Sequence, residues 1–428
     1  MSALVSDAMS ALSTPPTWMV VIRVYGSILY ATGRWPEAAV GSAATPLTEG
    51  HIDAWFEDCA RHGVAAVLWQ ANCGGTLTYP SAHVPLAGDP PLPPRFRIGA
   101  EPHEQGWTAG DWAWLGEQCR RFDTLEAAVR AAHRHGVALI LNFSVFDLPG
   151  VWCTAESWPG GSPLFDRDLW LWSRDQRTRL EGIPCYGDPR LRELRLAEVR
   201  EALDRGVDGI ALGFFSHCDA AAGDEPHRFG FNPCVVEEFR ERYGVDVLRE
   251  PFDTAAWYAL HGEHFTRFVQ AVSAETRRRG RALLGYARTD GIHGWAGRGT
   301  PVISQGMAAG GVHRFDARTG RSSDQPAAGF HVDYERWGRE GLVDALVALP
   351  PPYPHGLDAA AAMREAAGVP VLVWRKIIAC DPDLPADKRA EITAVRDGSV
   401  DGYVLHFMYW TDCRHPRGDY NHPASLLG

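Results

Sequence analysis

The segment Gly206-Val-Asp-Gly-Ile-Ala-Leu-Gly-Phe-Phe215 ends a helix-like stretch and turns at once into a short apolar strand. Six further segments repeat this arrangement, and they begin at Gly63, Gly136, Gly280, Gly341, Gly368 and Gly398. Gly at the end of a helix adopts the left-handed conformation without a steric penalty and returns the chain to the sheet. A short strand that is apolar throughout is typical of a parallel strand buried on both faces.

One more apolar strand precedes this series, at Trp18–Val24, so the sequence predicts eight strands. Eight βα units in series predict an α/β fold of the (β/α)8 TIM-barrel class. We expect a single barrel domain over residues 17–428 after a flexible N-terminal lead at 1–16, with the eighth helix short or absent. The predicted helix N-caps are Asp123, Asp188, Thr254 and Asp333.

Composition and charge limit the class of protein. The 428 residues are 45% hydrophobic and 22% charged, as in ordinary globular proteins. The net charge of −11 argues against nucleic-acid binding, and no apolar run is long enough to cross a membrane. The nine Cys form no CxxC pair and the N-terminus lacks a signal-peptide pattern, so we expect reduced thiols in a cytoplasmic protein. We expect no cofactor and no metal, and a homo-oligomer is left open.

The spacing of the strands predicts where a site would form. Successive strand-opening glycines are first 61 to 74 residues apart, and then only 27 and 30 residues apart. Because each helix passes tightly into its strand, the surplus residues belong to the loops at the C-terminal face, where barrel enzymes build their sites. We therefore predict long loops after strands 1–5, with insertions at Asn72–Arg121, Phe146–Asp188, Ser216–Phe252 and Asp290–Phe330.

Alternation along each strand predicts the residues that line the barrel. In the strand after Gly206, the small Gly209, Ala211 and Gly213 are expected to face inward, and the large residues to face the helices. The same reasoning and the strand ends give the candidate substrate-binding residues, which are Arg23, Tyr25, Trp69, Asn142, His217, Tyr286, Arg288, Trp374, Arg375, His406 and Trp410. Trp rings suit the stacking of sugars, although a Trp can equally pin its own loop, and a polar strand end can be purely structural.

Several segments resemble a known family. They are Val67-Leu-Trp-Gln70, Gly182–Glu193, Gly206–Leu212, Gly230–Gly244 and Asp333–Asp344. Over about residues 18–410 the chain resembles the barrel of glycoside-hydrolase-like proteins related to glycoside hydrolase family 10. The resemblance implies a glycosidase-like barrel but no particular substrate. We expect a small carbohydrate or glycoside as the partner of its site, because polymers do not enter the cytoplasm in which we expect the protein.

The chain departs from that family at the catalytic acids. Where many relatives carry an acid at the end of the fourth strand, this sequence has Gly213, and the seventh strand ends in Trp374-Arg375-Lys376 instead of Glu. A glycosidase needs two carboxyl groups, about 5 Å apart if retaining and about 6.5–9.5 Å apart if inverting. The acids would then come from loops, and the candidates are Asp147, Asp219 and Asp290.

Three interpretations follow. The first is a glycosidase that uses loop carboxylates on a small glycoside or glycosylated metabolite, and we favour it. The second is a lyase, isomerase or transferase that acts on a small anionic or sugar-like metabolite. The third is a catalytically silent sugar-binding barrel, because a fold alone does not choose between these functions.

Overall fold

The computed structural model describes residues 17–23, 46–61, 63–70, 72–73, 75–89, 97–98, 107–148, 163–214, 229–289, 292–294, 315–316, 321–322, 329–349, 355–376, 390, 393–394, 397–398 and 400–406. The predicted N-terminal lead and the predicted position of a short eighth helix both lie outside these residues.

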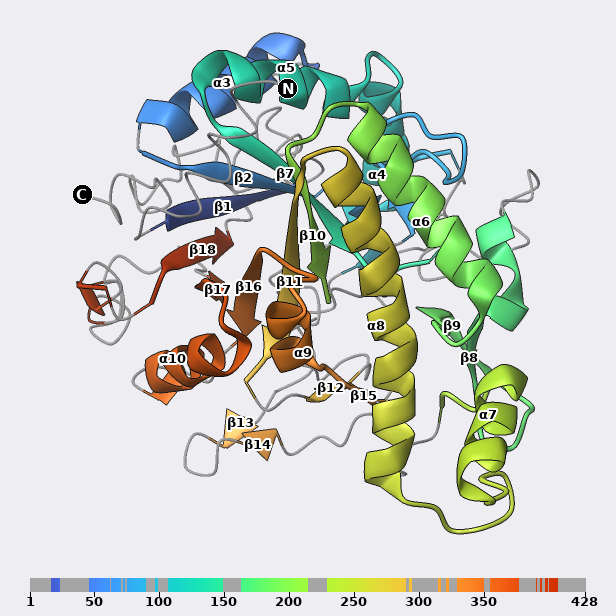
Figure 1. Cartoon of the computed structure of the whole chain (residues 1–428). Coiled ribbons are helices and arrows are strands. Elements are labelled where there is room, and N and C mark those ends of the chain that lie inside the picture. Colours follow the sequence, from blue (N-terminus) through green and yellow to red (C-terminus); the bar gives the residue numbers. More distant parts are fainter. Residues whose placement is uncertain are drawn as a thin grey trace.

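A closed barrel of parallel strands forms the centre of the molecule (Figure 1). Around it the strands follow the order β1-β18-β17-β16-β11-β10-β7-β2, so the first strand pairs with the last and no edge remains open. Their bounds are β1 Thr17–Arg23, β2 Ala66–Gln70, β7 Ala138–Ser144, β10 Gly209–Gly213, β11 Ala282–Arg288, β16 Ala345–Leu349, β17 Val371–Lys376 and β18 Gly402–His406. The predicted barrel class is therefore confirmed by the strand pairing.

The stagger of the strands is also that of a barrel of this class. Followed through β2, β7 and β10, Val21 comes into register with Ala282 of β11. Followed the other way through β18, β17 and β16, Thr17 comes into register with Tyr286. Val21 and Thr17 are four residues apart on β1, and Ala282 and Tyr286 are four residues apart on β11. These two offsets add up to a shear of about eight, which is typical of (β/α)8 barrels.

Helices cover the outside of the barrel in alternation with the strands. They are α3 Glu49–Arg61, α5 Thr124–His135, α6 Pro189–Asp204, α8 Thr254–Arg278, α9 Tyr334–Arg339 and α10 His355–Ala367. Asp123, Asp188 and Asp333 accept hydrogen bonds from the first turns of α5, α6 and α9, as predicted. For α8 the predicted cap Thr254 is wrong by one residue, because Asp253 accepts from the amides of Ala255 and Ala256.

The strand-opening glycines behave as the sequence predicts. All seven have φ between 62° and 90°, the left-handed region that favours Gly. At Gly136, φ is 68° and the amide donates to the carbonyls of Ala132 and His133 at the end of α5. This turn delivers the chain into β7 within two residues, so the long connections lie on the opposite side of the barrel.

Those connections carry small elements of their own. Between β2 and α5 lie β3 Asn72–Cys73, β4 Thr76–Leu77, β5 Arg97–Ile98, β6 Trp107–Thr108 and α4 Ala109–Cys119. Between β7 and α6 lie the 3-10 turns Pro163–Phe165 and Arg167–Leu169 and the hairpin of β8 Trp170–Trp172 and β9 Arg179–Pro184. α7 Pro233–Tyr243 precedes α8, and β12 Ile292–Gly294, β13 Phe315–Asp316, β14 Arg321–Ser322 and β15 Gly329–His331 precede α9.

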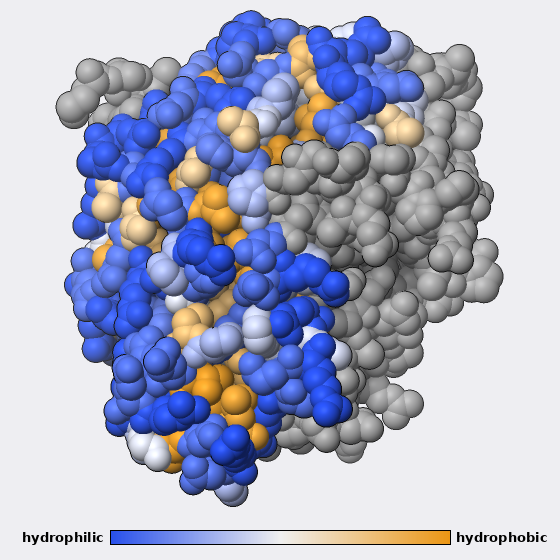
Figure 2. Space-filling view, turned by 90° about the vertical axis from the view of Figure 1, so that its right-hand side faces the viewer, coloured by the Kyte–Doolittle hydropathy of each residue, from blue (hydrophilic) through white to orange (hydrophobic). Residues whose placement is uncertain are grey.

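The face of the molecule drawn in Figure 2 is mainly hydrophilic over its described part, with apolar residues in small groups. Among the described residues, Tyr243 is an exposed large hydrophobic side chain. None of the described helices is both long enough and apolar enough to cross a membrane.

Candidate functional site

The register of the barrel strands separates an inner face from an outer face. Trp69 packs on Phe56 of α3 with ring centroids 6.0 Å apart, and Arg195 of α6 lies 4.1 Å above the ring of Phe143. These contacts mark the face toward the helices. In β2, β7 and β10 the alternate residues Gln70, Asn142 and Ala211 share a register row and therefore face the interior.

The same alternation brings together several predicted residues. Ser144, Gly213 and Tyr286 form the next inward row toward the C-terminal face. Arg288 and Trp374 follow two residues farther along β11 and β17, on the inward side. Tyr286 and Trp374 are buried and Arg288 is partly buried. In β10, Ala211 and Gly213 lie in these inward rows, and Leu212 is in register with Phe143, which faces the helices. The predicted split of β10 into small inward and large outward residues is therefore confirmed.

Asn142 is the most informative of these inward residues. Its side chain is 1% exposed, and neither Nδ2 nor Oδ1 has a hydrogen-bond partner within the described structure. Leaving a buried polar group unsatisfied costs about 1–3 kcal/mol. The amide donates through Nδ2 and accepts through Oδ1. A bound group with several hydroxyls would satisfy both atoms, because one hydroxyl can accept from Nδ2 while another donates to Oδ1.

Beyond Asn142, a network of hydrogen bonds shapes the end of β7. The Asn72 side chain accepts from the Ser144 amide and donates to the Ser144 carbonyl, both at 3.3 Å. The Ser144 hydroxyl donates to Oδ2 of Asp147 at 3.1 Å. Asp147, predicted as a catalytic carboxyl, is 1% exposed at this position. Its carboxylate therefore has a fixed orientation at the C-terminal end of the barrel.

A buried ion pair supports the same strand end from the helix layer. Nη1 of Arg195 donates to both carboxylate oxygens of Glu198 at 2.8 Å, and Nη2 donates to the Ser144 carbonyl at 2.6 Å. Each side chain is 2% exposed. Burial raises the pKa of Glu198 to about 7, although Arg195 acts in the opposite direction. The sequence predicted neither residue, yet both lie on the buried stripe of α6 with Leu191 and Ala202, at helical spacing.

One predicted pocket residue lies on the wrong face. Trp69 was predicted to bind substrate, but its ring packs against Trp55 and Phe56 of α3 and is buried in the helix layer. The inward residue at this end of β2 is instead Gln70, which shares the register row of Asn142. Sequence alternation alone could not decide between these two adjacent residues at a strand end.

The remaining predictions fall on parts that the structure describes incompletely. Tyr25, His217, Asp219, Asp290 and Trp410 lie outside the described residues. Arg23, Arg375 and His406 are described only as backbone positions of β1, β17 and β18, where His406 is in register with Lys376 and Val21. These residues stay predictions.

No protein-family model matches the sequence, and a search of curated proteins finds no match. Among solved structures, the glycoside hydrolase domain of PgaB (BpsB) from Bordetella bronchiseptica is 12% identical, with a TM-score of 0.49 over 91% of this chain and 94% of that one. The catalytic domain of a β-amylase from Paenibacillus polymyxa is 10% identical, with a TM-score of 0.46 over 97% and 98%. A β-galactosidase from the psychrophilic Marinomonas ef1 is 11% identical, with a TM-score of 0.48 over 96% of this chain and 58% of that one. At these identities and TM-scores the similarities do not assign a function.

Proposed function

We propose that this chain is a glycoside-hydrolase-like enzyme that acts on a small glycoside at the C-terminal face of the barrel. The observation that carries the proposal is the buried Asn142 amide, which has no partner within the described residues at either polar atom. Sugar hydroxyls both donate and accept, so they match an amide better than a simple anion does. Asp147 lies five residues farther along the chain, three residues beyond the end of β7.

In this proposal Asp147 is one member of the carboxyl pair that glycoside hydrolysis requires. Its hydrogen bond from the Ser144 hydroxyl, together with the bonds that Asn72 and Arg195 donate to the Ser144 carbonyl, fixes the carboxylate. A preorganised group of this kind avoids reorientation during the reaction. The second carboxyl is proposed to be Asp219 or Asp290, because Asp219 follows β10, which pairs with β7, and Asp290 follows β11, the next strand around the barrel.

The test uses a panel of small aryl glycosides and metabolite glycosides with the purified full chain. We expect turnover of at least one, and we expect Asp147→Asn to lower kcat by about 100-fold or more, the scale of one acid–base group. Asp219→Asn and Asp290→Asn are measured in parallel to identify the partner. Asp204→Asn is the matched control, because Asp204 is an exposed carboxyl that pairs with Arg279 on the helix layer.

Two results would contradict the proposal. A folded wild-type protein that turns over none of the panel would argue against hydrolysis, and binding of sugars without product would favour the silent barrel. If all three Asn variants keep the wild-type rate, the assignment of the carboxylates is wrong even though the activity is real.

A further inference from the structure

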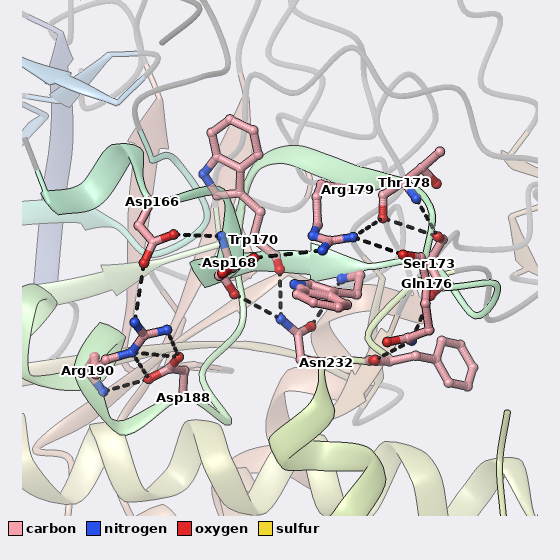
Figure 3. A network of polar contacts seen from close by, with 12 residues as sticks. Asp166, Asp168, Trp170, Ser173, Gln176, Thr178, Arg179, Asp188, Arg190 and Asn232 are labelled. Atoms are coloured by element: carbon pink, nitrogen blue, oxygen red, sulfur yellow. Dashed lines mark hydrogen bonds and ion pairs between the residues drawn. The ribbon is translucent and has the colours of Figure 1, made fainter. Parts of the chain in front are cut away.

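A network of polar contacts holds the hairpin of β8 and β9 in place (Figure 3). Asn232, at the start of α7, donates through Nδ2 to the Trp170 carbonyl at 2.8 Å and accepts from the Trp172 amide at 3.1 Å. The Phe231 amide donates to the Trp172 carbonyl at 3.0 Å. The strand that carries the two Trp residues is thus held along its whole length by α7 and the residues before it.

The turn of this hairpin is fixed as well. Gln176 has φ of 63°, which is unfavourable for a residue with a side chain by about 1–2 kcal/mol. Its Nε2 donates to the carbonyls of Ser173 and Phe231 at 3.2 and 2.8 Å. The Ser173 hydroxyl accepts from the Thr178 amide at 3.0 Å. A strained residue persists where its surroundings determine the conformation, as they do here.

Arg179 lies on this rigid support with little compensation of its charge. Its guanidinium stacks on the ring of Trp172, its cross-strand neighbour, 3.2 Å from the ring centroid. Nη1 donates to the carbonyls of Gln176 and Thr178 at 3.4 and 3.2 Å. The carboxylate that pairs with it among the described residues is Asp168, with Oδ1 3.7 Å from Nη2. The Arg179 side chain is only 17% exposed, and its burial lowers the pKa of the guanidinium.

Arg190 lies in the same region, and carboxylates compensate the charge of its guanidinium (Figure 3). Its Nε donates to both oxygens of Asp188 at 3.2 and 3.1 Å, and its Nη2 donates to Oδ2 at 2.7 Å. Asp166 adds a contact to Nη1 at 3.3 Å. Every guanidinium nitrogen of Arg190 therefore donates to a carboxylate, whereas Nε of Arg179 has no acceptor among the described residues.

Three buried donors of the hairpin have no acceptor in the described part of the chain. They are Nε of Arg179 and the indole nitrogens of Trp172 and Trp170. Trp170 is 2% exposed, so its indole nitrogen is shielded from bulk solvent. Each of these groups can only donate, in contrast to the Asn142 amide. The chemistry that matches them is a group with several acceptor oxygens and a negative charge.

The hairpin joins the candidate site directly. The amide of Leu148, the residue after Asp147, donates to the carbonyl of Gly182 in β9 at 2.9 Å. Gly182 lies in the irregular part of the hairpin and has φ of 73°. A ligand that engages Asp147 is therefore next to the chain segment that carries Arg179.

We propose that Arg179, with the indole donor of Trp172, forms a subsite for a carboxylate, and that the sugar bound at this face is a uronic acid. The identification of the sugar rests on the proposed function, whereas the carboxylate subsite rests on the hairpin alone. A planar guanidinium presents parallel donors to a carboxylate, and this geometry selects it over a hydroxyl group.

The experiment is calorimetric binding of methyl glucuronide, methyl glucoside and acetate to the full chain and to its Asp147→Asn variant. We expect methyl glucuronide to bind about 10- to 100-fold more tightly than methyl glucoside, the range of a hydrogen bond to a charged group. Arg179→Gln should remove this preference, and Arg179→Lys should remove most of it because an ammonium has no fork. Arg190→Gln is the matched control and should keep the preference.

Equal affinity for the two glycosides, or a preference that survives in both Arg179 variants, would overturn the subsite. Acetate that binds as tightly as methyl glucuronide would show an anion site without sugar recognition and would overturn the uronic acid. Folding of each variant is checked by circular dichroism, and Arg179→Lys serves if Arg179→Gln does not fold. Preferential binding without turnover of any glycoside would refute the proposed hydrolysis alone, and turnover without preference would refute the subsite alone.

Discussion

At the scale of single residues, the geometry of the candidate site depends on the few groups that hold Ser144 in place. Its carbonyl accepts hydrogen bonds from Asn72 of β3 and Arg195 of α6, and its hydroxyl orients Asp147. Arg195 in turn depends on Glu198, because a buried charge is tolerated only when it is paired and hydrogen-bonded. The ion pair of Arg195 and Glu198 therefore contributes both to the stability of the fold and to the geometry of the candidate site.

The ion pair gives a prediction for stability. We expect Glu198→Ala to lower the free energy of unfolding by about 3–5 kcal/mol, because it leaves the Arg195 charge buried and unpaired. The double variant Arg195→Met, Glu198→Leu should lose much less, since apolar residues of similar volume replace both charges. Urea unfolding at pH 8, above the raised pKa of Glu198, measures both. Equal losses in the two variants would show that packing, and not charge, dominates here.

At the scale of elements, close approaches between segments fix how the helices lie on the barrel. α8 crosses β15 at Gly262, where a Cβ would overlap the carbonyl oxygen of His331. Elsewhere Gly338 of α9 meets the carbonyl of Ala367 in α10 in the same way. Both contacts bring together segments that are far apart in the sequence or separated by a strand, and glycine is the residue that permits them.

Gly262→Ala tests this close approach. Although Ala favours a helix by about 1 kcal/mol over Gly, we expect a net loss of roughly 1–3 kcal/mol from overpacking. Gly50→Ala in α3 is the control, because its Cβ would lie at an ordinary 3.6 Å from Oγ1 of Thr48. That substitution should be neutral or stabilising. Chemical unfolding measures the free energy of unfolding of both variants. A loss of stability of similar size in both would contradict the close approach at Gly262.

At the scale of the whole molecule, closure of the barrel joins the two ends of the chain's strand series. β1 pairs with β2 on one side and with β18 on the other, although β1 and β18 are the first and last of the barrel strands in sequence. A closed barrel has no edge strand, so no row of backbone donors and acceptors is exposed to another chain. Closure of the barrel therefore depends on the pairing of β1 with β18, the barrel strand most distant from it in sequence.

Val20→Pro tests closure, because Val20 is in register with both Val67 and Leu405. Proline removes a ladder hydrogen bond and is excluded from central strands, so we expect a loss of at least about 3 kcal/mol and increased aggregation. Val20→Thr keeps the backbone amide and the branched shape, and it should lose less. Thermal unfolding followed by light scattering measures both effects. A Val20→Pro protein as stable as Val20→Thr would show that β1 is dispensable.

The sequence by itself determined the barrel. Its signals are local: a left-handed Gly ends a helix, and an apolar strand begins two residues later after Gly136 and three residues later after Gly206. The alternation in β10 predicted which of its residues face inward, because side-chain direction repeats every two residues. Asn142 and Tyr286 were found in this way, and Asp147 was found as a strand-end acid.

Only the tertiary structure decided the rest. Trp69 and Gln70 are adjacent at a strand end, and only packing against α3 shows that Trp69 faces outward. The pairing of Arg195 with the Ser144 carbonyl, and the incomplete compensation of Arg179, depend on segments that meet only after the chain has folded. Local sequence patterns act over a few residues, whereas burial and charge compensation are set by neighbours that come from anywhere in the chain.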